Sequence, residues 1–364
     1  MDQTIEWTPF VSVGIIMKNE GEHIASTLSF LINQAYPKES FEIIIADGGS
    51  VDGSISEAMR ILGPSGIAFQ ILDTRDYQDA LWGNNFGHSF SRNVILDHLS
   101  VHSEFVAFTD ADCRVDNMWL VSLVNVMLGA SEREIWAGGP RRVETQKVTD
   151  PMELMMNYYF TSSILALGNP AFTERRVKYL PSIAGYNSIY RRSIFDVYRF
   201  DTEFPFNTDD IELNFRLTHD GYVFLCAPRA LVYHRMDPSI WRFIVQMFKY
   251  GKWAGFVMRK HCLLPRLYVV IALAWVLYLV LSPVMLLAEL WMPAISWYFL
   301  WFLGAVLISG AVFIENIRKM RNLVSLWVFL LVPSQVVAYG WWVLQSLRIH
   351  RKKPMTKNII TSAS

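Results

Sequence analysis

Hydrophobic residues in the first two thirds of the chain occur in two kinds of segment. Short apolar runs rich in β-branched residues predict strands over 11–17, 41–46, 67–72 and 105–112. Between these runs, apolar residues recur at helical spacing, which predicts helices over 24–32, 55–62 and around 91–93. Strands that alternate with helices are typical of an α/β fold with a mostly parallel, Rossmann-like sheet.

The last third of the chain has a different pattern. Charged residues become sparse after about residue 266, and the apolar segments Leu267–Leu290 and Trp297–Ile314 are long enough to span a bilayer, which takes about 20 residues. A third apolar segment, Leu323–Leu347, is interrupted by Pro333-Ser334-Gln335. We therefore predict four parts: a water-soluble α/β domain (1–237), an amphipathic interfacial segment (238–265), C-terminal transmembrane helices (266–350) and a basic tail (351–364).

The charges beside the apolar segments predict how the chain lies in a membrane. The first apolar run, Phe10–Met17, is short and no basic residue precedes it, so we expect no signal peptide and a soluble domain in the cytosol. Arg318, Lys319 and Arg321 follow the second span, as the positive-inside rule requires. A full third crossing would put the basic tail outside. Either the third segment is re-entrant or the rule fails here, and we hypothesise re-entry.

Composition narrows the classes of partner. Hydrophobic residues make up 52% of the chain and the mean hydropathy is +0.24, which agrees with a membrane part. Lys and Arg total 33, as do Asp and Glu, and no basic stripe is present, so we expect no nucleic-acid partner. Cys113, Cys226 and Cys262 have no CxxC spacing, which argues against a disulfide framework or a zinc site and fits a reducing compartment.

Two carboxylates follow the apolar run that begins at Phe105. Asp110 and Asp112 are two residues apart, so on an extended chain their side chains point to the same side. They lie where a parallel strand ends, which is where open α/β sheets bind ligands. Such a pair suits Mg²⁺ or Mn²⁺ bound to the phosphates of a nucleotide. The alternative is an Asp-rich turn without a ligand.

A second polar turn follows the predicted strand 41–46. It begins with Asp47-Gly48-Gly49 and lacks the G-x-G-x-x-G pattern, which argues against a nicotinamide-binding site. An Asp at a strand end can bond a base or ribose, and the glycines let the backbone approach a nucleotide closely. An ordinary turn between strand and helix explains the same residues.

Four motifs together resemble the family 2 glycosyltransferases: Asn19-Glu20, the stretch 44–54, Ser91-Arg92-Asn93 and the stretch 108–112 occur in that family's order and spacing. The resemblance covers about residues 9–260. It implies a GT-A fold, a nucleotide-sugar donor and inversion at the anomeric carbon. By the same resemblance the donor-binding residues are Asn19, Glu20, Asp47, Arg92, Asn93 and Asp110, and the metal ligands are Asp112 and Asp110.

Two positions depart from the family pattern. Ile16 stands where the family often has Pro, and Gly48 stands where it often has a second Asp. Neither change removes a ligand that the mechanism requires.

An acidic pair, Asp209-Asp210, precedes an apolar helical pattern. The resemblance implies that Asp210 is the catalytic base and Asp209 the flanking acid. Direct displacement at an anomeric carbon needs a carboxylate that takes the proton of the acceptor hydroxyl. The alternative is a helix N-cap with a charged first turn, with Thr208 or Asp209 as the cap.

The resemblance also assigns three isolated residues. Asn187 lies in a stretch found near the donor sugar, and His234 lies where relatives have a His near the diphosphate or metal. The segment 246–250 resembles a weakened Gln-x-x-Arg-Trp motif of processive polysaccharide synthases, in which Lys249 would face the diphosphate. A polar strand edge, a structural His and an interfacial anchor are the respective alternatives.

Together these features predict a metal-dependent glycosyltransferase of the hexosyl type, integral to the membrane, with its catalytic domain in the cytosol. We expect a nucleoside-diphosphate sugar, a UDP sugar first among them, as donor and a lipid-linked glycan as acceptor. A processive polysaccharide synthase is the alternative within the enzyme class. A catalytically silent scaffold that binds nucleotide sugar or lipid is the alternative outside it.

Overall fold

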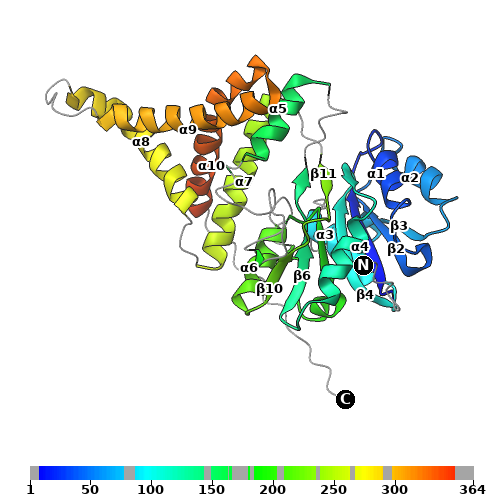
Figure 1. Cartoon of the computed structure of the whole chain (residues 1–364). Coiled ribbons are helices and arrows are strands. Elements are labelled where there is room, and N and C mark those ends of the chain that lie inside the picture. The colour runs from blue at the N-terminus through cyan, green and yellow to red at the C-terminus, as the bar shows by residue number, and fades with distance from the viewer. Residues whose placement is uncertain are drawn as a thin grey trace. The chain divides into compact units, whose positions relative to one another are not determined.

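The computed structural model describes residues 8–77, 87–142, 149–162, 164–165, 179–180, 184–202, 209–234, 238–262, 267–289 and 297–348 (Figure 1). The chain forms two compact units. The first contains Met1–Ile240 and Leu303–Leu331, and the second contains Trp241–Phe302 and Val332–Ser364. The first unit therefore includes part of the predicted membrane region.

The first unit is built on an eight-stranded sheet in the order β3-β2-β1-β4-β9-β6-β10-β8. Its strands are β1 (Phe10–Met17), β2 (Phe41–Asp47), β3 (Ala68–Asp73), β4 (Ser103–Asp110), β6 (Glu134–Gly138), β8 (Tyr179–Leu180), β9 (Ser188–Arg191) and β10 (Val223–Cys226). The four strands β3, β2, β1 and β4 are mutually parallel. Strand β9 runs antiparallel between β4 and β6, and β10 is parallel to β6. The predicted α/β fold with a mostly parallel sheet is confirmed.

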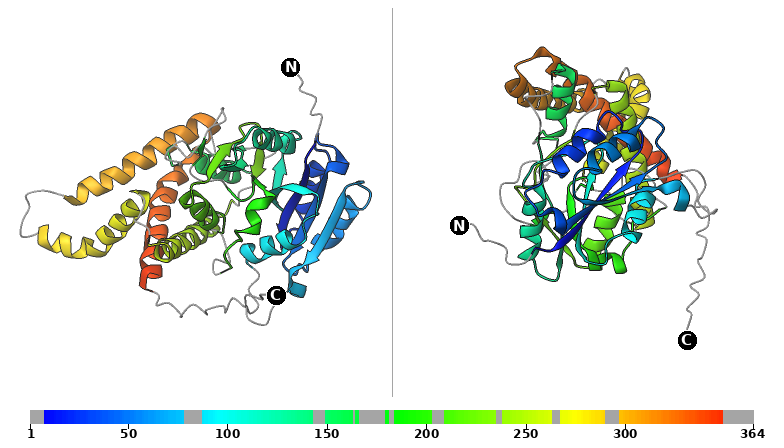
Figure 2. Two further views of the ribbon diagram at one scale, coloured as in Figure 1. Left: turned by 90° about the horizontal axis from the view of Figure 1, so that it is seen from below. Right: turned by 90° about the vertical axis from the view of Figure 1, so that its right-hand side faces the viewer.

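Helices cover both faces of this sheet (Figures 1 and 2). One apolar cluster joins the sheet to α1 (Ile24–Leu31), α2 (Ser54–Leu62) and α4 (Trp119–Leu128), and the other joins it to α3 (His88–Asp97) and α6 (Asp209–His219). Because both faces are covered, every residue of β2 is buried, which explains its nearly continuous apolar sequence. The first four predicted strands are all present, and Asp112 lies just beyond the end of β4.

A small second sheet was not predicted. It contains β5 (Cys113–Val115), β11 (Val232–His234) and β7 (Arg141–Arg142), in the order β5-β11-β7. Strands β5 and β11 are antiparallel, and their register pairs Cys113 with His234. This sheet brings the residues just after β4 beside the end of β11, although they are far apart in sequence.

Within the residues that the structure describes, the first unit also contains α5 (Pro151–Phe160) and the short 3₁₀ helices η1 (Lys38–Ser40), η2 (Thr74–Tyr77), η4 (Arg192–Asp196) and η5 (Leu323–Trp327). The N-cap of α5 is Asp150, whose side chain accepts a hydrogen bond from the backbone of Met152 at 2.8 Å. Just after α5, the hydroxyl of Ser162 donates to Glu315 at 2.6 Å.

The remaining helices are α7 (Ile240–Lys260), α8 (Leu267–Glu289), α9 (Trp297–Met320) and α10 (Val328–Arg348). Among the described residues, one helical stretch is long and apolar enough to cross a membrane, Leu323–Ser346, with a mean hydropathy of 1.8. Pro333 lies inside the continuous helix α10, so the described residues show no chain reversal at Pro333-Ser334-Gln335, and the re-entry of this segment in a membrane stays a prediction. Pro333 is the sixth residue of α10, so its missing N–H removes one bond near the helix start without ending the helix.

Glycines allow close helix packing within the second unit. A Cβ at Gly251 of α7 would lie 2.2 Å from the carbonyl oxygen of Tyr339 in α10, and one at Gly255 would lie 1.8 Å from the Ser346 hydroxyl. The two glycines are four residues apart and therefore share one face of α7. This small-residue spacing lets the backbones of α7 and α10 approach closely, as in helix pairs within membranes.

Candidate active site

Asp110 and Asp112 meet His234 at the carboxyl end of β4. The His234 Nε2 atom lies 3.5 Å from Asp112 Oδ1 and 4.0 Å from Asp110 Oδ2. One donor atom from each of Asp110, Asp112, Cys113 and His234 lies within 4.8 Å of the others. The predicted pair is thus brought together with His234. Cys113 was not predicted at this site, because only the register of the second sheet places it beside His234.

The residues of this cluster fit a divalent cation. The Asp110 Oδ1 atom is buried, and within the described part of the chain it has no hydrogen-bond partner. Two carboxylates and an imidazole are donors that Mg²⁺ and Mn²⁺ accept. Burial, with Asp112 and Asp110 nearby, raises the pKa of the Cys113 thiol well above its usual range, so the oxygen and imidazole donors are the ones available.

Burial also raises the pKa of Asp110, against the lowering effect of the nearby Arg92 guanidinium. Glu20, in the loop after β1, is exposed to the negative charges of this carboxylate cluster. Burial, followed by repulsion from Asp112, Asp110 and Asp52, raises its pKa to about 7. Glu20 is therefore close enough to Asp110 and Asp112 to respond to their charges, and its predicted contact with the donor stays a prediction.

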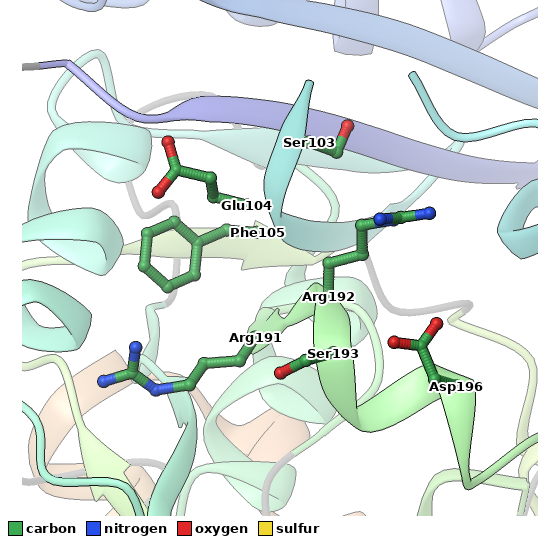
Figure 3. A pocket seen from close by; sticks show the side chains of 7 residues that line it. All are labelled: Ser103, Glu104, Phe105, Arg191, Arg192, Ser193 and Asp196. Atoms are coloured by element: carbon green, nitrogen blue, oxygen red, sulfur yellow. The ribbon is translucent and has the colours of Figure 1, made fainter. Parts of the chain in front are cut away.

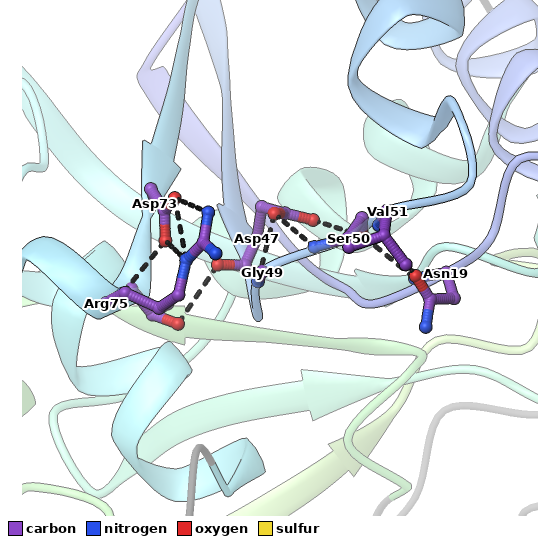
Figure 4. Close-up of polar contacts among 8 residues, drawn as sticks. Asn19, Asp47, Gly49, Ser50, Val51, Asp73 and Arg75 are labelled. Atoms are coloured by element: carbon purple, nitrogen blue, oxygen red, sulfur yellow. Dashed lines mark hydrogen bonds and ion pairs between the residues drawn. The ribbon is translucent and has the colours of Figure 1, made fainter. Parts of the chain in front are cut away.

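Asn19 and Asp47 shape the loop that follows β2 (Figure 4). The Asp47 carboxylate accepts hydrogen bonds from the backbones of Gly49 and Ser50 at 3.0 and 2.8 Å. Asn19 has a positive φ of 54°, and its side-chain oxygen accepts from the Val51 backbone at 2.9 Å. Asp47 is 1% exposed, so its side chain serves the turn itself. Its predicted contact with a nucleotide stays a prediction.

Arg92 connects the cluster to the acidic pair at the start of α6. Its Nη1 atom pairs with Asp209, and its Nη2 atom lies 3.6 Å from Asp110 Oδ1. The side chains of Arg92 and Asp209 are 5% and 3% exposed, so this is a buried ion pair. Breaking one side of such a pair leaves an uncompensated buried charge.

Asp210 is the more accessible member of the acidic pair. Its Oδ2 atom accepts a hydrogen bond from the Gly185 backbone at 2.8 Å, and its Oδ1 atom accepts one from the Ile211 backbone at 2.7 Å. Burial and the adjacent Asp209 raise the pKa of Asp210 to about 6, against the lowering effect of Arg92. A carboxylate with this pKa is ionised at neutral pH and is still basic enough to accept a proton.

Asn93 and Asn187 have structural roles that the sequence did not reveal. The Asn93 amide donates to the Phe200 carbonyl at 2.8 Å and accepts from the Phe200 backbone N–H at 3.0 Å. Asn187 is fully buried, accepts from the Trp119 indole N–H at 2.8 Å and donates to the Ala230 carbonyl at 2.9 Å. These bonds tie both side chains to the surrounding fold, and their predicted contacts with the donor stay predictions.

We expect Asn187→Ala to destabilise the protein while the affinity for nucleotide stays unchanged. The change leaves the Trp119 indole N–H and the Ala230 carbonyl without their partner, at a cost of about 1–3 kcal/mol for each unsatisfied buried group. The thermal unfolding midpoint would report the loss, and calorimetry with a nucleoside diphosphate would report affinity. A large loss of nucleotide affinity with an unchanged thermal unfolding midpoint would instead support the predicted contact of Asn187 with the donor.

Lys249 lies on α7, in the second unit, and its predicted contact with a diphosphate stays a prediction. In the first unit, a cavity of about 480 Å³ extends from the carboxylate cluster and is lined by Asp112, Cys113, His234, Glu22, Glu153 and Asn157, among others. A smaller cavity of about 280 Å³ lies at the opposite end of β4, beside Ser103 and Arg191 (Figure 3). Because Asp110 ends the same strand that Ser103 begins, this smaller cavity is separate from the carboxylate cluster.

Comparison with known proteins defines the class of this chain. The sequence model of glycosyl transferase family 2 matches residues 12–199, just over half of the 364 residues. The chain therefore belongs to glycosyl transferase family 2, a class of transferase enzymes.

Curated relatives include glycosyltransferases of archaea. Glycosyltransferase AglE of Haloferax volcanii is 33% identical over 121 residues, which are 33% of this chain and 36% of that protein. A dolichyl N-acetyl-α-D-glucosaminyl phosphate 3-β-D-2,3-diacetamido-2,3-dideoxy-β-D-glucuronosyltransferase of Methanococcus voltae is 22% identical over 252 residues, 69% of this chain and 74% of that protein. The match with AglE thus spans only about a third of its length.

Among solved structures, the mannosyltransferase PcManGT of Pyrobaculum calidifontis, in complex with GDP-Man and Mn²⁺, superposes with a TM-score of 0.61. The superposition covers 92% of this chain and 88% of PcManGT at 16% sequence identity. At this identity the likeness concerns the fold alone, and it supports the GT-A architecture.

Proposed function

We propose that this chain transfers a sugar, with inversion, from a nucleoside-diphosphate sugar to an acceptor hydroxyl. The observation that carries the proposal is the arrangement of two acidic groups joined by Arg92. Asp110 and Asp112 form one group with His234, and Asp209 and Asp210 form the other. A displacement at an anomeric carbon needs both a base for the nucleophile and charge stabilisation for the leaving diphosphate.

Asp210 is the proposed base. Its carboxylate is held by the Gly185 and Ile211 backbones, and Asp209 cannot replace it because Asp209 is 3% exposed and paired with Arg92. Asp210 would accept the proton of the acceptor hydroxyl as the new glycosidic bond forms. Burial and, after it, the acidic neighbour Asp209 raise the pKa of Asp210 and make it a stronger base than an exposed Asp.

Asp110, Asp112 and His234 would hold a Mg²⁺ or Mn²⁺ ion. When bound, the ion would neutralise charge on the donor diphosphate. Glu20 and the loop shaped by Asn19 and Asp47 lie at the ends of the neighbouring strands β1 and β2, where the nucleotide would bind.

We propose a UDP sugar as donor and a lipid-linked glycan as acceptor. The acceptor class is supported by the Methanococcus voltae relative, whose name specifies a dolichyl phosphate-linked substrate. The donor class is supported by the GT-A likeness to PcManGT, which was solved with a nucleoside-diphosphate sugar and Mn²⁺. Because the donor bound to PcManGT is a GDP sugar, both UDP sugars and GDP sugars are to be tested as donors.

We further propose that the C-terminal helices anchor the protein in a membrane with the catalytic domain in the cytosol. The stretch Leu323–Ser346 supports the anchor, and the basic residues Arg318, Lys319 and Arg321 support the orientation. The continuous helix α10 would allow a complete third crossing, whereas re-entry would keep the basic tail in the cytosol, as the positive-inside rule favours. A single cysteine at the C-terminus distinguishes the two paths when an impermeant label is added to the extracellular side of sealed vesicles. Labelling of this cysteine would establish a complete third crossing, and its protection would establish re-entry.

The pH dependence follows from the raised pKa of Asp210. The base works in its ionised form, so we expect kcat to rise with pH through about pH 6 and to level off above it. An exposed Asp, with an ordinary pKa near 3.9, would place this limb about two pH units lower. Initial rates between pH 4.5 and 8 at saturating donor would measure it, and a flat profile down to pH 5 would contradict the assignment.

A donor panel tests the proposed function as a whole. The full chain, purified in detergent, would be incubated with UDP and GDP sugars, with Mn²⁺ or after chelation, and with membrane lipid extract as acceptor. We expect metal-dependent release of nucleoside diphosphate from one donor, with the sugar recovered in the lipid fraction. A long polymer as product would instead favour a processive synthase. Donor binding without transfer to any acceptor offered would favour a silent scaffold.

A further inference from the structure

The Arg92 guanidinium lies between two carboxylates and two aromatic rings. It sits on α3, is 5% exposed as a side chain, and pairs with Asp209 on α6 while facing Asp110 at the end of β4. Two aromatic rings flank it, with Phe108 at 5.6 Å and Phe200 at 5.4 Å from the guanidinium carbon. A guanidinium between two rings and two carboxylates has little surface left for another ligand.

The residue after Arg92 serves the same arrangement. Asn93 bonds the Phe200 backbone through both its amide nitrogen and its amide oxygen, at 2.8 and 3.0 Å. These two bonds fix the segment whose ring covers the guanidinium. Asn93 therefore helps to hold the guanidinium of its neighbour Arg92 in place.

Gly185 closes the remaining side and links Arg92 to the proposed base. A Cβ at Gly185 would lie 2.7 Å from Arg92 Nη2 and 2.9 Å from Nη1, so the glycine backbone lies directly against the guanidinium. The N–H of the same residue donates to Asp210 at 2.8 Å. Any larger residue would have to displace Arg92 and, with it, the donor that orients Asp210.

We propose that Arg92 is a positioning residue rather than a donor ligand. By holding Asp209 and Asp110 through one guanidinium, it sets the distance between the start of α6, which carries Asp210, and the cation-binding end of β4. Without the positive charge of the Arg92 guanidinium, the two acidic groups would face each other across the site with no opposite charge between them. The inference rests on the proposed function for the reaction it serves, and it replaces the nucleotide contact that the sequence led us to expect for Arg92.

Arg92→Met and Arg92→Lys test this role, with Arg60→Met as the matched control. Arg60 makes an exposed ion pair with Glu57 on α2, so the control removes the same charge from a solvated site. We expect Arg92→Met to lower kcat about 100-fold, the loss typical of a misplaced catalytic group, while the calorimetric Kd for UDP or GDP with Mn²⁺ changes less than about threefold. Arg92→Lys should recover part of kcat, and Arg60→Met should match the wild type.

Hydrogen exchange provides a readout that does not depend on activity. We expect the amides of Gly185 and of the first turn of α6 to exchange faster in Arg92→Met and unchanged in Arg60→Met. If Arg92→Met does not fold, the double variant Arg92→Met/Asp209→Asn removes the unpaired buried carboxylate, and Gly185→Ala displaces the guanidinium without changing any charge. Both should show the same loss of kcat with a retained Kd.

Two results would overturn the proposal. A Kd for nucleotide weakened about tenfold or more, with kcat at saturation retained, would make Arg92 a donor ligand. Unchanged exchange of the α6 amides would show that Arg92 does not position them. If the wild type binds nucleotide but transfers no sugar, the proposed function fails, and hydrogen exchange still decides the role of Arg92.

Discussion

Asp210→Asn is expected to lower kcat by about 10²–10⁴-fold, the usual contribution of a general base. The amide keeps the size of the side chain and can still accept a hydrogen bond from the Gly185 backbone, so the first turn of α6 should remain in place. It cannot take a proton from the acceptor hydroxyl. The loss should therefore fall on kcat, while the Kd for the donor stays close to the wild-type value.

The pH profile sharpens this test. The limb near pH 6 belongs to the raised pKa of Asp210 and should disappear in Asp210→Asn, which leaves a low and nearly flat rate. Asp97→Asn is the matched control, because Asp97 makes an exposed ion pair with Arg199. Wild-type kcat in Asp210→Asn would remove Asp210 from the mechanism. A residual activity that kept the limb near pH 6 would assign that limb to another group.

Asp112→Asn is expected to weaken the binding of Mn²⁺ by about 100-fold or more. Changes to residues that merely support a metal ligand cost about 10–100-fold in affinity, and Asp112 would be a ligand itself. The side chain carries one of the two charges that face His234, at 3.5 Å from its Nε2 atom. Without the Asp112 charge, the cation would depend on the Asp110 carboxylate, which already pairs with the Arg92 guanidinium.

Electron paramagnetic resonance of free Mn²⁺ measures this affinity without any donor or acceptor. Asp116→Asn is the matched control, because Asp116 lies in the same segment and its Oδ1 atom accepts from the Met118 backbone at 3.0 Å, a bond that Asn can keep. We expect the control to bind Mn²⁺ like the wild type. Equal binding by Asp112→Asn would move the cation site away from the cluster.

The two acidic groups could be found in the sequence because local patterns carry them. A buried strand that ends in Asp-x-Asp places both carboxylates at one edge of a sheet, whatever surrounds it. An acidic pair before a helical pattern likewise marks the start of a helix, where negative charge is favoured. The strands, the helices and these two pairs were accordingly predicted close to where the structure has them.

The partners of these groups could not be found in the same way. Arg92 and Asp209 are 117 positions apart, and no local period indicates that their side chains meet. Asn93 and Asn187 carry polar amides that suit a ligand in sequence, yet pairing over 107 and 68 positions commits them to Phe200 and Trp119. Cys113 follows Asp112 in the sequence, but only the antiparallel register of β5 and β11 places it beside His234.

The sequence by itself therefore determined the α/β class, the order of the elements and the positions of the acidic residues, because hydrophobic periodicity and strand ends are local properties. Only the tertiary structure decided which polar side chains face the site and which hold the fold together. It also decided that Pro333 lies within a continuous helix and that Arg92 is enclosed by its neighbours. The physical reason is that burial and hydrogen-bond pairing depend on contacts between distant segments, which the local pattern of residues does not specify.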